Sequence, residues 1–189
     1  LRDWKAAGRL RYIGVTHYTA GAHDELERVL RAEPLDFVQV NYSAGEREAE
    51  QRILPLARDR GIAVLVNRPF TEGALFQRVR GQSLPAWAAD FGAESWAQLF
   101  LKWILAHPAV TCAIPGTTSV RNVETNLRAA QGPLPDAAMR RRMEEAMAKA
   151  EEAIAAWIET ALDTGQDIPQ PSSVEALRKK HKEWKAWVW

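Results

Sequence analysis

The chain has 189 residues, 47% hydrophobic and 26% charged, and this mixture excludes a wholly disordered chain, a collagen and a simple coiled coil. Its 25 Lys and Arg against 24 Asp and Glu leave a formal net charge of +1, which points to no polyanionic partner. The single cysteine cannot form an internal disulfide, which fits a reducing compartment, and polar residues interrupt the longest apolar stretch. We therefore expect a cytoplasmic protein with no membrane span, and the first residue, Leu1, suggests that the chain begins inside something larger.

Four short apolar and β-branched runs predict strands. The first three start about 25 residues apart, close to the length of one strand-plus-helix unit. Because the runs are continuously apolar, we expect parallel strands that are covered on both faces, with Cys112 in the core. The four runs are Arg11–Tyr18, Asp36–Ser43, Ile62–Phe70 and Val110–Pro115.

The segments between these strands have apolar residues at helical spacing, which predicts helices there. Leucines three and four residues apart predict helices over His23–Ala32 and Arg47–Arg60. Ser95, with Gln98 three residues later, predicts a capped helix start, and a further helix is expected near Ser119–Ala130. The sequence thus predicts an α/β fold of four βα units.

A long helix is predicted from Pro135–Asp136 to about Leu162, with Met139, Met143 and Met147 on its apolar stripe. Beyond it we expect a short helix over Val174–His181 and a strand over Glu183–Trp189. Ala and Glu rise past Met143 and no further βα unit follows. We therefore predict two domains, residues 1–142 and 143–189.

Polar residues end all four predicted strands, where ligands collect in parallel α/β folds. These ends are Thr16-His17, Asn41-Tyr42, Asn67-Arg68 and Gly116-Thr117-Thr118. In the last of them a strand runs through glycine into a helix start, where free N–H groups and the helix dipole favour a phosphate. The alternative is that Thr118 or Ser119 merely caps the helix.

The sequence holds no convincing nucleophile–base pair. No lysine stands at a strand end. His17 is the only histidine at a strand end, and a lone histidine is more often a structural or ligand-binding donor than a general base. His17 and His23 have poor spacing for a metal, so no metal is expected. Two basic runs, Arg140–Arg142 and Lys179–Lys182, are more typical of solvated helix faces than of nucleic-acid binding.

Residues 1 to about 142 resemble the C-terminal half of an aldo/keto reductase. The resemblance rests on Trp4-Lys5 with Gly8 and Arg11–Val15, on Phe37–Ser43, on Phe100–Val110, and on Ala113–Thr117 followed by Asn126. It implies an incomplete (β/α)8 barrel, that is, a half-barrel-like parallel sheet of four βα units followed by the long helix and a helix-strand tail. The family transfers hydride from NAD(P)H to a carbonyl, so the resemblance implies an NADP or NAD cofactor.

The same resemblance implies cofactor-binding positions. Thr16 and His17 would lie near the nicotinamide carboxamide together with Gln39, and Asn67 would replace the family's ring-stacking Tyr. Gly116 and Thr117 would hold phosphate, and Asn126 would approach the adenine. Asn122 and Thr125 depart from the residues often used for a 2′-phosphate, which leaves NADP against NAD open. The family's catalytic groups come from four strands that this chain lacks, so we expect weak or absent cofactor binding and little or no reductase activity.

The segment Glu144–Trp189, and above all Ala153–Ser172, resembles part of a HicB-type antitoxin, a domain that neutralises an RNA-cleaving partner. Both resemblances cover only part of their families' domains. The apolar stripe of the long predicted helix continues without a break through the junction of the two segments. We therefore hypothesise that the chain is a chimera or a fragment, joined within one helix. The alternatives are a structural or interaction scaffold without small-molecule chemistry, and partner binding through the tail. Four parallel strands do not close a barrel, so we also expect the tail strand or a second copy to cover an open edge.

Overall fold

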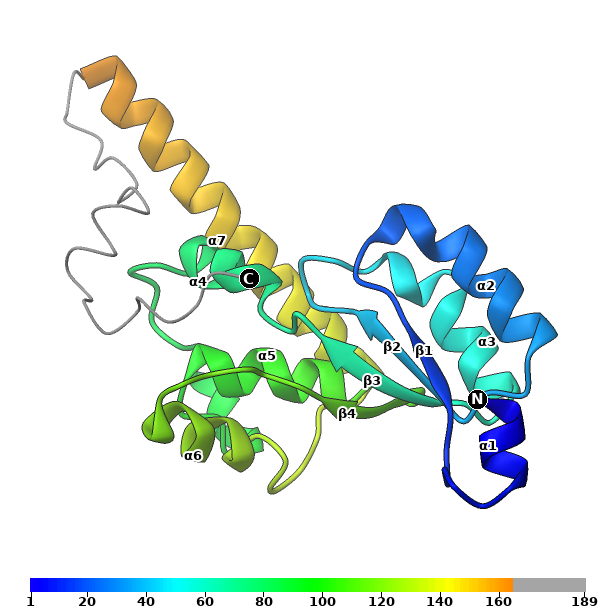
Figure 1. Ribbon diagram of the computed structural model, residues 1–189. Coiled ribbons are helices and arrows are strands. Elements are labelled where there is room, and N and C mark those ends of the chain that lie inside the picture. The colour runs from blue at the N-terminus through cyan, green and yellow to red at the C-terminus, as the bar shows by residue number, and fades with distance from the viewer. Residues whose placement is uncertain (165–189) are drawn as a thin grey trace. The chain divides into compact units, whose positions relative to one another are not determined.

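The computed structural model describes residues 1–164, apart from some side chains between residues 150 and 161. Within the N-terminal unit, residues 1–151, four parallel strands form one sheet in the order β1-β2-β3-β4 (Figure 1). The strands are β1 Gly14–Thr16, β2 Phe37–Asn41, β3 Ala63–Asn67 and β4 Val110–Ala113. All four lie inside the predicted runs, which confirms the α/β fold of four parallel units. None of the described helices is long and apolar enough to cross a membrane.

Helices alternate with these strands as the leucine spacing predicts. The α-helices of this part are α1 Arg2–Ala6, α2 His23–Ala32, α3 Ile53–Asp59, α4 Ala74–Arg78, α5 Trp96–Leu105 and α6 Val120–Arg128. Short 3-10 turns over Ala20–Ala22, Glu48–Glu50, Thr71–Gly73 and Ala86–Phe91 complete the connections. The predicted helix Arg47–Arg60 is therefore a 3-10 turn followed by α3.

Side-chain caps fix two helix starts where the sequence predicts them. The Ser95 hydroxyl accepts the backbone N–H of Gln98, and the Ser119 hydroxyl accepts that of Asn122. The Gln98 amide oxygen in turn accepts the N–H of Glu94, one residue before the cap, at 2.7 Å. Each cap satisfies an N–H group that has no partner inside its helix, typically worth about 1 kcal/mol.

One face of the sheet carries most of the core. Val38, Val40, Val64 and Val66 alternate along β2 and β3 and are fully buried. The residues between them, such as Gln39 and Leu65, are only partly buried, and Thr16 and Cys112 in the same row are exposed. The prediction that the strands are covered on both faces is therefore wrong for the described residues.

Cys112 is a second correction, because it is exposed and not part of the core. It lies on the partly open face of β4, which is an edge strand. The register slips between Val64 and Leu65, and the Thr111 hydroxyl accepts the Val64 N–H there, at 3.0 Å. An apolar run indicates a strand, but what covers that strand depends on its neighbours.

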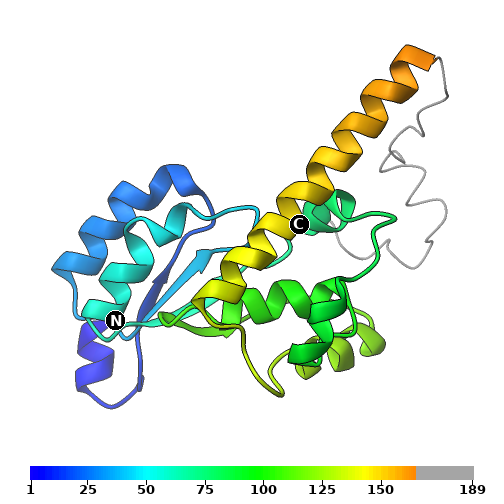
Figure 2. The same ribbon diagram turned by 180° about the vertical axis from the view of Figure 1, so that it is seen from behind.

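The helix α7 spans Ala137–Thr164, and its first turns belong to the N-terminal unit and pack against the rest of that unit (Figure 2). The Asp136 carboxylate accepts the Met139 N–H at 2.8 Å and so caps the helix start near the predicted position. Met143 is 1% exposed, and Met139 and Met147 pack on the same core cluster. Residues 152–189 form a second unit, and the predicted helix Val174–His181 and strand Glu183–Trp189 lie outside the described residues. The sequence boundary at 142/143 stays a prediction.

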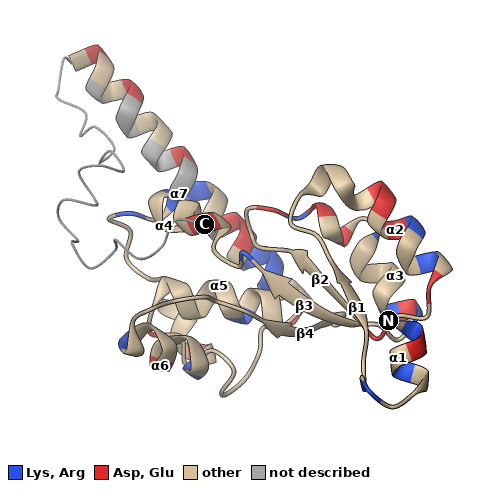
Figure 3. Ribbon diagram, in the orientation of Figure 1, with Lys and Arg blue, Asp and Glu red and all other residues tan. Residues whose placement is uncertain are grey.

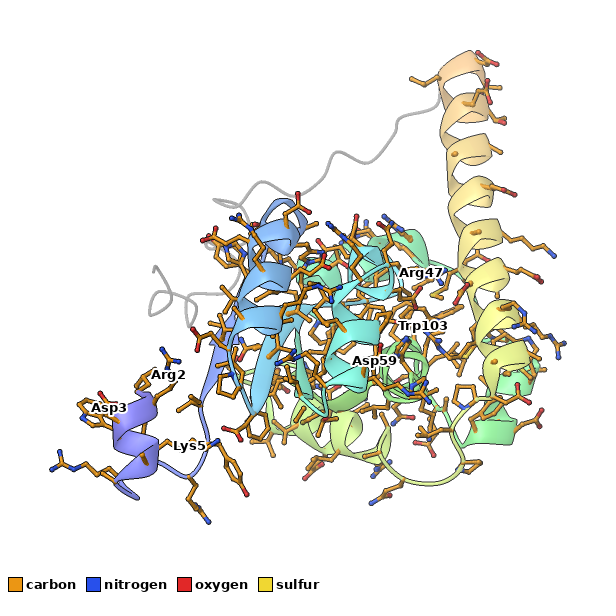
Figure 4. The ribbon with its side chains drawn as sticks, turned by 90° about the vertical axis from the view of Figure 1, so that its right-hand side faces the viewer. Arg2, Asp3, Lys5, Arg47, Asp59 and Trp103 are labelled. Carbon is orange, nitrogen blue, oxygen red and sulfur yellow. The ribbon has the colours of Figure 1, made fainter. Side chains whose placement is uncertain are left out.

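A cluster of ionic and aromatic groups holds α7 in place. Arg140 donates to the Tyr42 hydroxyl at 2.6 Å, to Glu50 at 3.0 Å and to the Trp103 carbonyl at 3.1 Å. Glu144 accepts from the Trp103 indole at 3.0 Å and pairs with Arg47 at 2.7 Å. The two guanidinium groups lie over the Trp103 ring, and Figure 4 labels Arg47 and Trp103 in this region.

Candidate functional site

The polar strand ends meet at the carboxyl edge of the sheet. Thr16 pairs with Gln39 in the β1–β2 register, and Asn41 pairs with Asn67 in the β2–β3 register. The ladder continues beyond β1, because the His17 N–H donates to the Gln39 carbonyl at 3.0 Å. It also continues beyond β4, where the Ile114 N–H donates to the Val66 carbonyl at 2.8 Å. The strand ends named from the sequence therefore share one edge.

A cavity of about 930 Å³ lies at the ends of β3 and β4. Its lining comes from the loop after β3, from the segment between β4 and α6, and from one side of α5 and of α6. Three of the seven predicted cofactor positions line it, namely Gly116, Thr117 and Asn126. Thr16, His17, Gln39 and Asn67 lie on the same edge of the sheet but do not line this cavity.

The start of α6 offers hydrogen-bond donors to the cavity. The Thr117 hydroxyl accepts the Ser119 N–H at 3.2 Å, and Ser119 caps the helix, so both hydroxyls hold the turn in place. The N–H groups of Gly116, Thr117 and Arg121 donate to no residue that the structure describes. A carbon atom added at Gly116 would meet nothing within 4 Å, so the backbone is open there. Such N–H groups at a helix start form an anion site.

Arginine side chains supply positive charge to the same cavity. Arg68, Arg121 and Arg128 line it, and Arg128 pairs with Glu94 while Arg68 pairs with Glu72. Arg121 has no ion-pair partner among the described residues. Glu124 also lines the cavity without an ion-pair partner among the described residues, so Arg121 supplies a local positive group beside the start of α6 but the lining has no net positive charge.

Arg68 stands at one of the predicted polar strand ends, although the family resemblance gives it no cofactor role. Its backbone has φ 49°, a left-handed conformation that costs energy for a residue with a side chain. Its guanidinium donates to the Tyr18 carbonyl at 3.3 Å and so links the ends of β3 and β1. Its Nε is buried without a hydrogen-bond partner. The signal available in the sequence was a cation directly after the strand-ending Asn67.

His17 organises the loop after β1. Its Nδ1 accepts the N–H groups of Tyr18 and Thr19, at 3.0 and 3.1 Å. The described lysines are engaged elsewhere or lie on another element, because Lys5 pairs with Asp36, Lys102 donates to the carbonyls of Gln131 and Pro133, and Lys149 is exposed on α7. Burial lowers the pKa of Lys102. No lysine near His17 therefore provides a proton donor in the described part of the chain.

Two buried acceptors at this edge lack partners. The amide oxygens of Asn41 and Asn67 accept no hydrogen bond, although the Asn41 nitrogen donates to Glu46 at 3.0 Å. A buried acceptor without a donor costs about 1–3 kcal/mol, so a ligand that brings an N–H or O–H group is favoured here.

No group of three or more His, Cys, Asp or Glu residues arranged to hold a metal occurs among the residues described.

Comparison with known families places this edge in context. The sequence model of the aldo/keto reductase family matches residues 1–146, more than half of the chain. This chain belongs to the aldo/keto reductase family. A second model, for HicB-like antitoxins of bacterial toxin–antitoxin systems, matches residues 137–189, and the two matches overlap in the first turns of α7.

Individual relatives agree with this assignment. The chain is 28% identical to an NADH-specific methylglyoxal reductase of Escherichia coli over 78% of its length and 52% of the relative's. It is 26% identical to a probable aldo-keto reductase of Glycine max, with 65% of this chain and 42% of that one covered. The chain thus spans about half the length, or less, of these curated aldo/keto reductases.

Solved aldo/keto reductases share the fold. The thermostable reductase Tm1743, solved with the inhibitor epalrestat, matches with a TM-score of 0.58 and 22% identity over 77% of this chain and 52% of its own. The holo form of AKR11C1 from Bacillus halodurans matches with a TM-score of 0.57 and 21% identity, over 77% and 53% of the two chains. A partial barrel of four parallel strands fits these neighbours, as the sequence predicts.

Proposed function

We propose that this aldo/keto reductase chain binds a reduced nicotinamide dinucleotide across the carboxyl edge of its sheet and does not reduce carbonyls by itself. The observation that carries the proposal is the cavity beside the start of α6, where Gly116, Thr117 and Arg121 offer backbone donors and positive charge. A dinucleotide carries two phosphates, which such a site favours. The E. coli relative is named for its use of NADH.

The roles of individual residues follow the family resemblance. Gly116 and Thr117 would hold phosphate and Asn126 would approach the adenine, and all three line the cavity. Thr16, His17, Gln39 and Asn67 would approach the nicotinamide end. The Asn67 amide oxygen, buried without a donor, fits the carboxamide N–H of that ring. When bound, the reduced nicotinamide ring supplies the hydride of the family's reaction.

Inactivity follows from the acid that carbonyl reduction requires. The carbonyl oxygen must take up a proton as hydride arrives, and a positioned acid contributes typically 10²–10⁴-fold. His17 Nδ1 is occupied as an acceptor, and Lys5 and Lys102 are engaged elsewhere. Lys5 and Lys102 therefore supply no acid at this edge, and the family's catalytic groups come from strands other than the four in this sheet, so we infer a binding module that lacks the positioned proton donor of the reaction.

Titration with NADPH and with NADH tests both parts of the proposal. We expect either nucleotide to quench the fluorescence of the tryptophans, because reduced nicotinamide absorbs their emission. We also expect no oxidation of NADPH above background when methylglyoxal is added. A flat titration would contradict binding, and turnover at a rate ordinary for an enzyme would contradict the inactivity.

Matched glycine variants localise the binding. Gly116→Asp places a carboxylate at the proposed phosphate site, where the side chain has open space, and should weaken nucleotide binding about tenfold or more. Gly21→Asp is the control, because Gly21 also has open space around it and does not line the cavity. Equal affinities of the two variants would place the nucleotide elsewhere.

A second candidate function concerns the tail. The match of residues 137–189 to HicB-like antitoxins favours binding of an RNA-cleaving toxin by this segment, and its overlap with the reductase match within α7 supports the hypothesis of a fusion. We expect a toxin of the HicA kind, coexpressed with the full chain, to copurify with it. Failure to copurify, with a HicB antitoxin as the positive control, would exclude this function.

A further inference from the structure

Both edges of the four-stranded sheet are unpaired among the described residues. β1 forms one edge and β4 the other. Natural edge strands usually carry a charge or a proline that prevents pairing with another chain. Here the edge strands read Gly-Val-Thr and Val-Thr-Cys-Ala, and Figure 3 shows all four strands free of charged residues. Nothing in either edge strand opposes pairing.

The exposed apolar surface gathers around the same two edges. Of the eleven large apolar side chains that are exposed in the described part of the chain, eight lie in segments that flank β1 or β4. Those around β1 are Leu1, Trp4, Tyr12 and Tyr18, and those around β4 are Ile114, Val120, Val123 and Leu127. Apolar surface that is concentrated in this way marks an interaction site.

Helix α6 presents the clearest unpartnered face. Val120, Val123 and Leu127 are three and four residues apart, so they lie on one side of the helix. They are 74%, 43% and 64% exposed. In an α/β barrel, the helix after a strand covers the groove between that strand and the next one. Here the next strand is absent from the sheet, since β4 is its edge.

The occupant must therefore offer a parallel strand edge and an apolar patch, and a second copy of this chain offers both. β1 of one copy is parallel in direction to β4 of the other when the two are related by a two-fold axis along the strands. This symmetry pairs β4 of each copy with β1 of the other, so two such contacts form. The combined sheet then has eight strands, the number in a closed parallel α/β barrel. An isologous arrangement of this kind leaves no edge unpaired.

We propose that two copies of this chain associate through the β1 and β4 edges into an eight-stranded closed sheet. The apolar face of α6 in each copy then covers the partner's β1 edge, beside Tyr12 and Trp4. Thr16 and Cys112, which are exposed on the partly open face, become enclosed. The association is argued from the sheet edges and the exposed face of α6, and not from the cavity that carries the proposed nucleotide binding.

Light scattering of the full chain during size-exclusion chromatography tests the association. We expect a mass of twice the 21.2 kDa of one chain at micromolar concentrations. Cys112→Arg places a charge on the exposed face of β4, and Val120→Asp places one on the α6 stripe, so each should yield the monomer. Gln51→Arg is the control, because Gln51 is exposed and distant in sequence from either edge, and it should remain a dimer. A wild-type monomer at all these concentrations would overturn the proposal.

Hydrogen exchange distinguishes this interface from one formed by the tail. We expect the amides of Gly14–Thr16 and Val110–Ala113 to exchange more slowly as the chain concentration rises, because parallel pairing gives edge amides new acceptors. Cys112→Arg should abolish that dependence while leaving the slow exchange of β2 unchanged, which also reports that the variant is folded. A dimer whose edge amides show no added protection, or one that survives both charge variants, would refute the proposed interface.

Discussion

Arg140→Ala is expected to lower the free energy of unfolding by about 3 kcal/mol. The Arg140 guanidinium is 14% exposed and donates to Tyr42, to Glu50 and to the Trp103 carbonyl. Its removal leaves the Glu50 carboxylate, 20% exposed, with one cation fewer, and it removes the contact with the Trp103 ring at 4.4 Å. Urea denaturation followed by circular dichroism measures the change.

The neighbouring Arg141 provides a matched control. Arg141 is exposed on the same turn of α7, and none of the described hydrogen bonds or ion pairs involves it. Arg141→Ala should therefore change stability by less than about 0.5 kcal/mol. If the two alanine variants unfold at the same urea concentration, the cluster around Trp103 does not hold α7 in place.

The pH dependence of stability provides a second readout of this cluster. Burial by itself raises the pKa of Glu50, but the hydrogen bonds from Tyr42, Arg47 and Arg140 outweigh it and hold the pKa below its ordinary value. Because the pKa is lower in the folded state, the stabilisation is present above the unfolded pKa of about 4.3 and is lost as the pH falls through the folded value. Arg140→Ala should reduce this acid-side loss of stability.

Ending the chain after Arg142 is expected to lower the free energy of unfolding by about 5 kcal/mol or more, enough to unfold a marginal domain. This truncation removes Met143, which is 1% exposed, together with Met147. It also removes Glu144, the partner of the Trp103 indole and of Arg47. Thermal unfolding followed by circular dichroism measures the loss.

A chain ending after Glu151 is the control for this truncation. It retains every contact of Met143, Glu144 and Met147 and ends where the first compact unit ends. We expect it to unfold with the same midpoint as the N-terminal unit of the full chain. Equal stability of the two truncated chains would mean that the packing of residues 143–147 contributes nothing, and that the sequence boundary at 142/143 is also the boundary of packing.

Local features of the sequence predicted the elements well. The strand β2 lies inside the run Asp36–Ser43, and α2 has the predicted bounds His23–Ala32. The caps at Ser95, Ser119 and Asp136 fell at or next to the predicted helix starts. Each of these features depends on residues within a few positions of one another, because a cap or a turn of helix forms its hydrogen bonds locally.

Long-range contacts were not predictable in this way. The Arg140–Tyr42 hydrogen bond joins residues 98 positions apart, and neither residue carries a local sign of it. Arg140 belongs to a basic run that is typical of a solvated helix face, whereas its side chain is only 14% exposed. Arg68 likewise gained its link to Tyr18 only when the ends of β1 and β3 met.

The sequence by itself determined the alternation of strands and helices, the shared edge of polar strand ends and the family, because periodicity, caps and motifs are properties of neighbouring residues. Only the tertiary structure decided which strand faces are covered, that Cys112 is exposed, and which three of the predicted cofactor positions line the cavity. The physical reason is that a side chain is buried only when a second surface, often from a distant part of the sequence, packs against it. An apolar strand is a core strand only when other elements cover it, and β4 has a strand neighbour on one side alone and no buried residue.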